Sequence, residues 1–393
     1  MRRRRRPLVP ILIVLLPVLL VAGIWLGGHP SYLPGFARDT LVADEDAQVY
    51  EEAIDLIKRD YYRGVDRDEL LDKSLGAAVK SLDDQFSNYF SPKDYSSFQE
   101  VTQGQFEGVG MTVEEAKRGL RVTTVYEGSP AAKGGLEKGD LITEVDGRSI
   151  AGSSSEASTA RIKGPAGTKV RLTVTDGGKS RDVELRRAQV DIPVVESDMQ
   201  TASDGKKIAH VRLSGFTSGA HGEVGAAVKK LLRQGADGVV LDLRDNGGGL
   251  LNEAVLVSSI FIPEGKIVST KGRSRPERVY DAAGGAIDTD IPVTVLVNRN
   301  SASASEIVTG ALQDRHRATV VGTRTFGKGV FQEIETLSNG GALDLTVGRY
   351  FLPDGEPLPK NGIKAQIKAK DDPKTKRDEA LAVALGVIAR DVR

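Results

Sequence analysis

The stretch Ser301-Ala302-Ser303-Ala304-Ser305-Glu306 stands between an apolar run, 291–297, and a run with helical periodicity, 307–313. This order predicts a strand, a sharp turn and a helix, with a small hydroxyl at the helix N-terminus. Free backbone N–H groups and the helix dipole favour developing negative charge at such a place. A second stretch, Thr325-Phe326-Gly327-Lys328-Gly329-Val330-Phe331-Gln332, contains a lysine that could act as the base for such a serine.

Around these stretches, residues 191–393 alternate between buried strands and amphipathic helices. This pattern is typical of a mixed α/β core, within a multidomain protein of the α/β (α+β) class. We expect strands over 208–213, 238–243, 291–297, 318–321 and 342–351, and helices over 224–232, 251–260 and 379–389.

A glycine cluster, Asn246-Gly247-Gly248-Gly249, follows the expected strand 238–243 and precedes a helix. Such a turn can bind a phosphate, but the spacing is neither G-x-G-x-x-G nor G-x-x-x-x-G-K-[ST]. The same backbone arrangement can hold the oxyanion of an acyl-transfer intermediate. We favour the oxyanion interpretation over nucleotide binding.

The composition of the 393-residue chain limits the possible functions. Apolar residues make up 39%, enough for packed cores in two or three domains. There are 54 basic and 54 acidic residues, so charge gives no support for nucleic acid as a partner. The absence of cysteine excludes disulfides, a thiolate nucleophile and cysteine-bound metal.

The N-terminus predicts a membrane anchor over residues 1–28. Five arginines, Arg2 to Arg6, precede an uncharged run, 8–27, that is long enough to cross a bilayer. The arginines would stay in the cytoplasm, which places the rest of the chain on the extracytoplasmic side of the cell membrane. A cleaved signal peptide is the alternative interpretation.

The following region, 38–102, has helical periodicity over 44–62 and again from Leu70 to Leu82. The apolar faces of these helices could pack within the chain or against a second copy of it, and the sequence leaves both open.

From residue 103 to 190 the pattern changes to short strands and glycine turns. The elements Gly108-Val109-Gly110-Met111, 120–125, Gly128-Ser129-Pro130 and Gly139-Asp140-Leu141-Ile142 occur in the order of a permuted PDZ domain, which this region resembles. The resemblance implies that Gly108, Val109, Gly110 and Met111 bind the C-terminal carboxylate of a peptide. The helix expected at 153–162 is rich in Ser, Ala and Thr, which predicts a shallow groove.

Elimination narrows the chemistry of the core. None of His29, His210, His221 and His316 lies in a recognisable metal or triad motif, so we expect them to be structural or solvated. A serine with a lysine base remains. Ser303 stands three residues before Glu306, the spacing of a helix capping box, which on local signals is an equally good account of that serine.

The motifs 300–307, 310–314, 325–329 and 241–249 resemble those of the carboxy-terminal processing peptidases, also called tail-specific proteases. The resemblance covers about residues 49 to 367 and implies a crotonase-like (ClpP/crotonase) core, serine endopeptidase activity, substrates with accessible C-termini and no cofactor. It further assigns roles to six residues: Ser303 as nucleophile, Lys328 as base, Gln332 as support of the lysine, and the backbone of Ala304 with Gly248 or Gly249 as oxyanion hole.

A lysine base needs an unusual environment. The free pKa of about 10.4 leaves under about 1% of a lysine unprotonated at neutral pH. The site must lower this pKa to about 7 to 8 by burial and by the exclusion of carboxylates. We expect Phe326 and its flanking glycines to supply apolar surroundings, and Gln332 to orient the amine without adding charge.

The sequence departs from the family at two places. Thr175 and Asp176 stand where the family often has an arginine that couples tail binding to activation, and Ala365-Gln366 replaces the usual Pro-Asp. A non-catalytic PDZ scaffold is the alternative function, although the serine, lysine, glutamine and glycine motifs occur together.

Overall fold

The computed structural model describes residues 45–176 and 178–392. The chain divides between Ser81 and Leu82 into two compact units. The anchor predicted at residues 1–28 and His29 lie outside the described residues. Within the described residues, no helix combines the length and the apolar character needed to cross a bilayer.

The first unit contains α3 (Glu45–Asp60) and α4 (Arg67–Lys80), close to the two helices predicted here. The guanidinium of Arg67, at the start of α4, pairs with Glu51 and Asp55 of α3 at 2.7 and 2.9 Å. Apolar side chains of α3 remain exposed in this unit, including Val49, Leu56 and Ile57.

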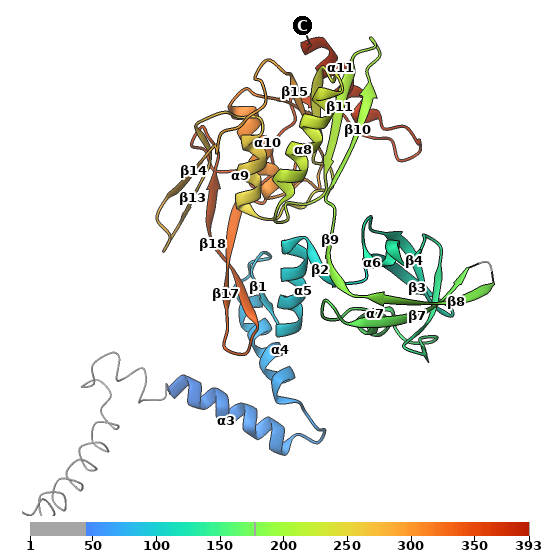
Figure 1. Cartoon of the computed structure of the whole chain (residues 1–393). Helices are drawn as coiled ribbons and strands as arrows, with labels where there is room; N and C mark the ends of the chain where they lie inside the picture. Colours follow the sequence, from blue (N-terminus) through green and yellow to red (C-terminus); the bar gives the residue numbers. More distant parts are fainter. Residues whose placement is uncertain (1–44, 177, 393) are drawn as a thin grey trace, which may run out of the picture. The chain divides into compact units, whose positions relative to one another are not determined.

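The core of the second unit is a six-stranded sheet in the order β10-β11-β12-β15-β16-β19. Figure 1 labels β10, β11 and β15 of this sheet. Only β10 is antiparallel to its neighbour within this sheet. Its strands are β10 (Val195–Thr201), β11 (Lys207–Leu213), β12 (Gly238–Asp242), β15 (Val293–Val297), β16 (Thr319–Gly322) and β19 (Ile367–Lys368).

Helices cover both faces of this sheet, which explains why β12 and β15 are buried at every residue. One face packs against α8 (Ala220–Arg233), α9 (Leu251–Ser259) and α10 (Ala304–Asp314). The other face packs against α11 (Glu379–Asp391). Buried residues of α8 follow helical spacing, so its apolar stripe fits one face of the sheet.

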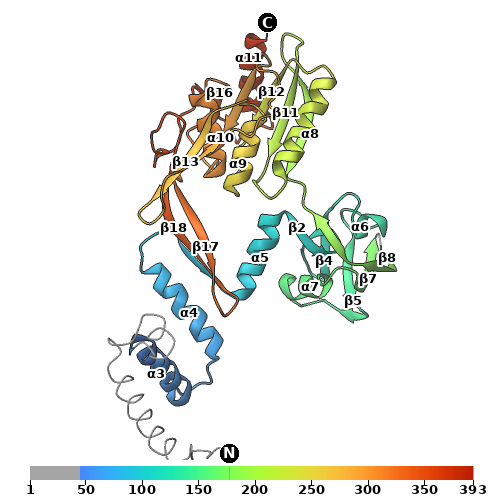
Figure 2. The ribbon, with the colours of Figure 1, turned by 60° about the vertical axis from the view of Figure 1, so that its left-hand side comes forward.

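A second sheet of the core has the order β1-β18-β13-β14, with β17 paired to β18. Figure 2 shows β17 and β18 as a two-stranded ribbon. The sequence predicted β18 at its observed bounds but gave no signal for β1. The strands are β1 (Asn88–Phe90), β13 (Lys266–Gly272), β14 (Arg278–Asp281), β17 (Val330–Thr336) and β18 (Ala342–Phe351).

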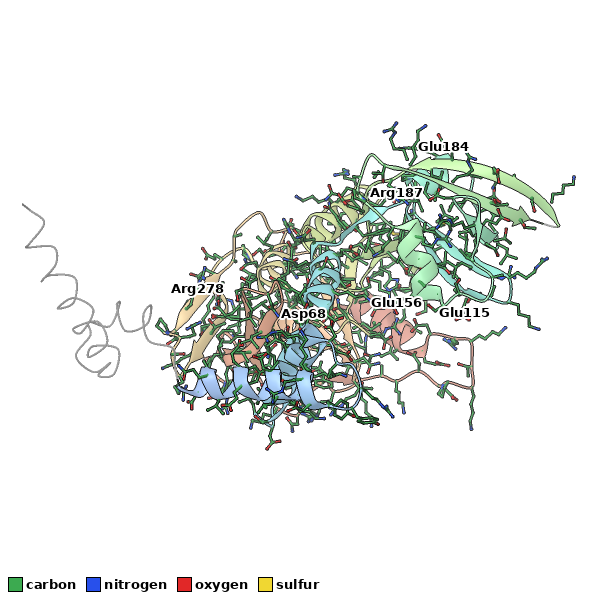
Figure 3. The ribbon with its side chains drawn as sticks, turned by 90° about the horizontal axis from the view of Figure 1, so that it is seen from below. Asp68, Glu115, Glu156, Glu184, Arg187 and Arg278 are labelled. Carbon is green, nitrogen blue, oxygen red and sulfur yellow. The ribbon has the colours of Figure 1, made fainter. Side chains whose placement is uncertain are left out.

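The region between α5 (Pro92–Gln103) and the core contains its own sheet, β3-β4-β5-β7-β8, with β6 on β5, and a separate pair, β2-β9. Arg187, labelled in Figure 3, donates hydrogen bonds to the carbonyls of Arg161 and Ile162 at the end of α7. A cation at a helix C-terminus is favourable. The elements are β2 (Gln105–Gly108), β3 (Met111–Ala116), β4 (Gly119–Val125), α6 (Pro130–Lys133), β5 (Leu141–Val145), β6 (Arg148–Ser149), α7 (Ser155–Ile162), β7 (Lys169–Asp176), β8 (Lys179–Arg186) and β9 (Ala188–Asp191).

Candidate active site

Ser303 occupies the turn between β15 and α10. Its φ of 54° and ψ of −112° lie outside the regions that residues with a side chain normally adopt. Such a conformation costs about 1 to 3 kcal/mol and persists only where the surrounding structure imposes it. Ser303 is buried, with 7% of its surface exposed, and it is the N-cap of α10.

The three serines of this turn differ in what their hydroxyls bind. Ser301 donates its hydroxyl proton to the carbonyl of Leu243 at 2.7 Å, and Ser305 donates to the carbonyl of Asn246 at 2.8 Å. These bonds tie the turn to the loop after β12. The Ser303 side chain instead lies beside the hydroxyl of Tyr350 and lowers the pKa of that hydroxyl.

Tyr350 belongs to β18 and is 6% exposed. Burial raises the pKa of its hydroxyl, and the side chain of Ser303 opposes that rise. The phenol therefore stays protonated beside the serine. This contact could not be predicted from the sequence, because Tyr350 lies in a strand pattern that carries no catalytic motif.

The glycine loop approaches the same serine. Gly248 has a φ of 103°, and a Cβ atom there would lie 2.9 Å from Cβ of Ser303 and 3.0 Å from the backbone nitrogen of Ala304. Gly249 lies instead against the backbone of Phe216. Only glycine permits so close an approach at Gly248.

Two backbone N–H groups are therefore close to Ser303. That of Ala304 is in the first turn of α10, where N–H groups lack an intrahelical acceptor. That of Gly248 donates to Oδ1 of Asn246 at 2.9 Å. An oxyanion that takes the Gly248 N–H must compete with this amide oxygen.

Glu306 connects the serine turn to the lysine loop. Its Oε2 accepts hydrogen bonds from the backbone N–H groups of Ser303 and Lys328, each at 2.9 Å. Its Oε1 accepts from the hydroxyl of Thr325 at 2.6 Å and from the N–H of Gly327 at 2.7 Å. Glu306 is completely buried. The capping-box spacing identified this residue as a partner of Ser303, but not as a partner of Lys328.

Lys328 is partly buried, and burial lowers the pKa of its amine, in the direction that the sequence analysis required. Its surroundings differ from those predicted. Phe326 is 40% exposed, and the ring near the amine belongs to Phe86, whose centroid lies 5.1 Å from Nζ. The site also contains carboxylates, contrary to the prediction. The charges of Asp344 and Asp84 raise the pKa of the Lys328 amine and so oppose the effect of burial.

Gln332 lies on β17, and its amide donates to the hydroxyl of Thr346 on β18 at 3.1 Å. Within residues 45–176 and 178–392, no hydrogen bond joins the Lys328 amine to Ser303 or to Gln332. The structure thus places Ser303 in a turn, Lys328 in a loop bound to the same carboxylate and Gln332 on β17, without direct hydrogen bonds among their described side chains.

Comparison with known proteins places this architecture in a family. Residues 207–369 match the family described as "Peptidase family S41", and residues 121–176 match "PDZ domain". The carboxy-terminal processing protease CtpA of Bacillus subtilis (strain 168) is 33% identical over 370 residues, which cover 93% of this chain and 78% of that protein. This chain belongs to peptidase family S41.

Two further proteins resemble this S41 chain. A Staphylococcus aureus (strain COL) protein named "Probable CtpA-like serine protease" is 34% identical over 326 residues, or 82% of this chain and 64% of that relative. The chain therefore spans about 64% of that relative's length. A solved "Photosystem II D1 C-terminal processing protease" has a TM-score of 0.52 and 28% identity, and the match covers 89% of this chain and 100% of that one.

The predicted carboxylate-binding loop of the S41 chain joins β2 to β3 and precedes residues 121–176, which match the PDZ domain. Val109 is buried, and its carbonyl accepts from the N–H of Ala131 at 2.7 Å. Gly110 has a φ of 82°, and its carbonyl accepts from the N–H of Tyr126 at 3.0 Å. Gly108 ends β2 and Met111 begins β3. The side chain of Asp176 lies outside the described residues.

Two of the described histidines form hydrogen bonds with carboxylates. His210 bonds Asp198 at 3.0 Å and Asp242 at 3.2 Å, and His221 bonds Glu253 at 2.8 Å. Among the described residues, no group of three or more acidic or histidine side chains is arranged to hold a metal ion.

Proposed function

We propose that this chain is a serine endopeptidase that binds the C-terminal tails of protein substrates through its PDZ domain and cleaves them with Ser303 and Lys328. One observation carries the proposal. The serine of a strained turn and the lysine loop are bound to the same buried carboxylate, that of Glu306. Both backbone nitrogens lie 2.9 Å from one oxygen, so neither residue can move far from the other.

In the proposed reaction, the neutral amine of Lys328 accepts the hydroxyl proton of Ser303 as its oxygen attacks a peptide carbonyl carbon. The N–H groups of Ala304 and Gly248 would stabilise the oxyanion, and the approach of Gly248 to Ala304 favours it over Gly249. The lysine ammonium then protonates the leaving amine as the C–N bond breaks. The neutral amine then deprotonates a water molecule, whose oxygen attacks the acyl carbon. As the bond between that carbon and the Ser303 oxygen breaks, the lysine ammonium returns the proton to Ser303.

Gln332 supports the lysine in this proposal, and Gly108, Val109, Gly110 and Met111 receive the substrate carboxylate. The core would adopt the crotonase-like fold, and the domains would follow the predicted boundaries 1–28, 38–102, 103–190 and 191–393. Residues 8–27 would anchor the chain in the cell membrane, with the catalytic part on its extracytoplasmic side. The exposed apolar residues of α3 are compatible with a second copy as partner.

Cleavage of an unstructured protein tail tests the assignment. Ser303→Ala and Lys328→Ala should abolish cleavage while thermal unfolding stays close to that of the wild type. Lys328→Arg should also be inactive, because a guanidinium does not lose its proton at working pH. A serine-directed covalent probe should label the wild type and not Ser303→Ala. Wild-type cleavage by Ser303→Ala would contradict the assignment of Ser303 as the nucleophile, whereas a wild type that neither cleaves the tail nor reacts with the probe would favour a binding scaffold.

A further inference from the structure

The segment 84–88, which precedes the PDZ domain in the chain, forms a hydrogen-bonded turn beside the candidate active site. Oδ2 of Asp84 accepts the hydroxyl proton of Ser87 at 2.6 Å, and Oδ1 of Asp84 accepts from the N–H of Phe86 at 3.1 Å. Ser87 is buried, and β1 begins at the next residue. The turn is therefore built into the core rather than part of a free linker.

A chain of hydrogen bonds leads from this turn to Gln332. The hydroxyl of Ser87 accepts from the backbone N–H of Thr346 at 3.0 Å. The hydroxyl of Thr346 accepts from the amide of Gln332 at 3.1 Å, and the two residues are paired in the β17–β18 register. Because each of these groups is hydrogen-bonded to the next, the position of Asp84 influences the side-chain amide of Gln332.

The same turn presents an aromatic ring and a carboxylate to Lys328. The Phe86 ring lies under the amine, where its π face attracts a cation. Burial raises the pKa of Asp84, but hydrogen bonds from Ser87, Thr346 and the Phe86 N–H outweigh it and lower that pKa. The Asp84 carboxyl is therefore ionised at neutral pH.

Three carboxyl groups come near Lys328 from the elements packed around it. Asp84 comes from the turn, Asp344 from β18, and Glu306 from α10, where Glu306 binds the lysine backbone N–H rather than its amine. Burial raises the pKa of Asp344, while the charge of Lys328 and a hydrogen bond from Asn88 partly offset this rise. Burial of Lys328 lowers the pKa of its amine and favours the neutral form, whereas Asp84 and Asp344 raise this pKa and favour the ammonium.

We propose that Asp84 is a positioning residue that, together with Asp344, sets the pH at which Lys328 becomes a free base, while its turn orients Gln332. The inference rests on the proposed function of Lys328 as the base. A nearby carboxylate stabilises the ammonium form, so it holds the enzyme in an inactive protonation state at low pH. The same carboxylate favours the transfer of the Ser303 proton to the neutral amine, because it stabilises the ammonium that this transfer forms.

The test is the pH dependence of kcat/KM of the full chain on an unstructured peptide substrate, with Asp84→Asn compared to Asp83→Asn. Asp83 is the exposed neighbour of Asp84, and its φ of 52° is one that asparagine also tolerates. Asp84→Asn should move the acidic limb of the profile to lower pH, with a gain of on the order of tenfold in kcat/KM on that limb. Asp83→Asn should follow the wild type.

An Asp84→Asn profile that superimposes on those of the wild type and Asp83→Asn would overturn the inference. Should Asp84→Asn fail to fold by circular dichroism, Asp344→Asn tests the same electrostatic effect from β18. Its acidic limb should also move to lower pH, and an unchanged limb would again overturn the inference. The rate at which a serine-directed probe labels Ser303 can be measured as a function of pH. It should show the same acidic limb in the absence of a peptide substrate.

Lys328→Ala separates this inference from the proposed function. If Lys328→Ala cleaves at the wild-type rate, the proposed function fails, whatever Asp84→Asn does. If Lys328→Ala is inactive and Asp84→Asn keeps the wild-type profile, only the role of Asp84 and Asp344 fails.

Discussion

Replacement of Glu306 by glutamine should uncouple the serine turn from the lysine loop. Its two carboxylate oxygens accept four hydrogen bonds, three of them from the backbone N–H groups of Ser303, Gly327 and Lys328. A glutamine amide has one oxygen and one NH2 group. In either orientation, at least one of these N–H groups would face the NH2 group instead of an acceptor.

The size of the expected loss in stability follows from the burial of Glu306. Glu306 is completely buried, so water cannot replace a lost acceptor. Each unsatisfied donor costs about 1 to 3 kcal/mol, and bonds to a charged group are worth about 1.5 to 3 kcal/mol. We expect Glu306→Gln to lower the free energy of unfolding by about 2 to 5 kcal/mol. A displacement of about 1 Å between Ser303 and Lys328 should lower kcat about a hundredfold.

The assay combines urea unfolding with kcat/KM normalised to the folded fraction. Glu253→Gln is the matched control, because Glu253 is 6% exposed and accepts from the N–H groups of Gly219 and His221, each at 2.9 Å. This control should lose comparable stability and retain activity per folded molecule. Full activity per folded molecule in Glu306→Gln would refute the coupling of the two loops through this carboxylate.

Three other expectations follow from the geometry. Gly248→Ala should lower kcat at least about a hundredfold, because the new Cβ would lie 2.9 Å from that of Ser303 and displace an oxyanion donor. Steady-state kinetics measures this loss, and a near-normal kcat would contradict the assignment of Gly248. Tyr350→Phe removes the hydroxyl that lies beside Ser303 and should lower kcat/KM about two- to tenfold, with an unchanged value as the contrary result. Burial would raise the pKa of Asp242, but hydrogen bonds from His210 and Arg244 outweigh it and lower the pKa to about 2. Because the pKa of Asp242 is lower in the folded state, its ionised form stabilises the fold above about pH 4, and this stabilisation is lost as the pH falls toward 2. Between these pH values, the free energy of unfolding measured with urea should fall by about 2 kcal/mol from this group in the wild type and not in Asp242→Asn.

Much of the core could be predicted from the sequence, because its elements are defined by local patterns. The runs that became β12 and β15 are apolar at nearly every position, which is typical of strands covered on both faces. The run 342–351 became β18 at its predicted bounds, and helical spacing placed α11 within a few residues. The residue types of the site, a serine at a helix start and a lysine between glycines, are likewise local features.

The sequence by itself determined the chemistry that the site offers, namely a serine, a lysine and glycines in motifs of the S41 family. Only the tertiary structure decided what surrounds the lysine. Phe86 and Asp84 reach it through the pairing of β1 with β18, and Asp344 reaches it from β18 itself. Pairing between distant segments leaves no periodic signal in either one. The electrostatic field that sets a pKa sums over such neighbours in space, so it exists only once the strands have met.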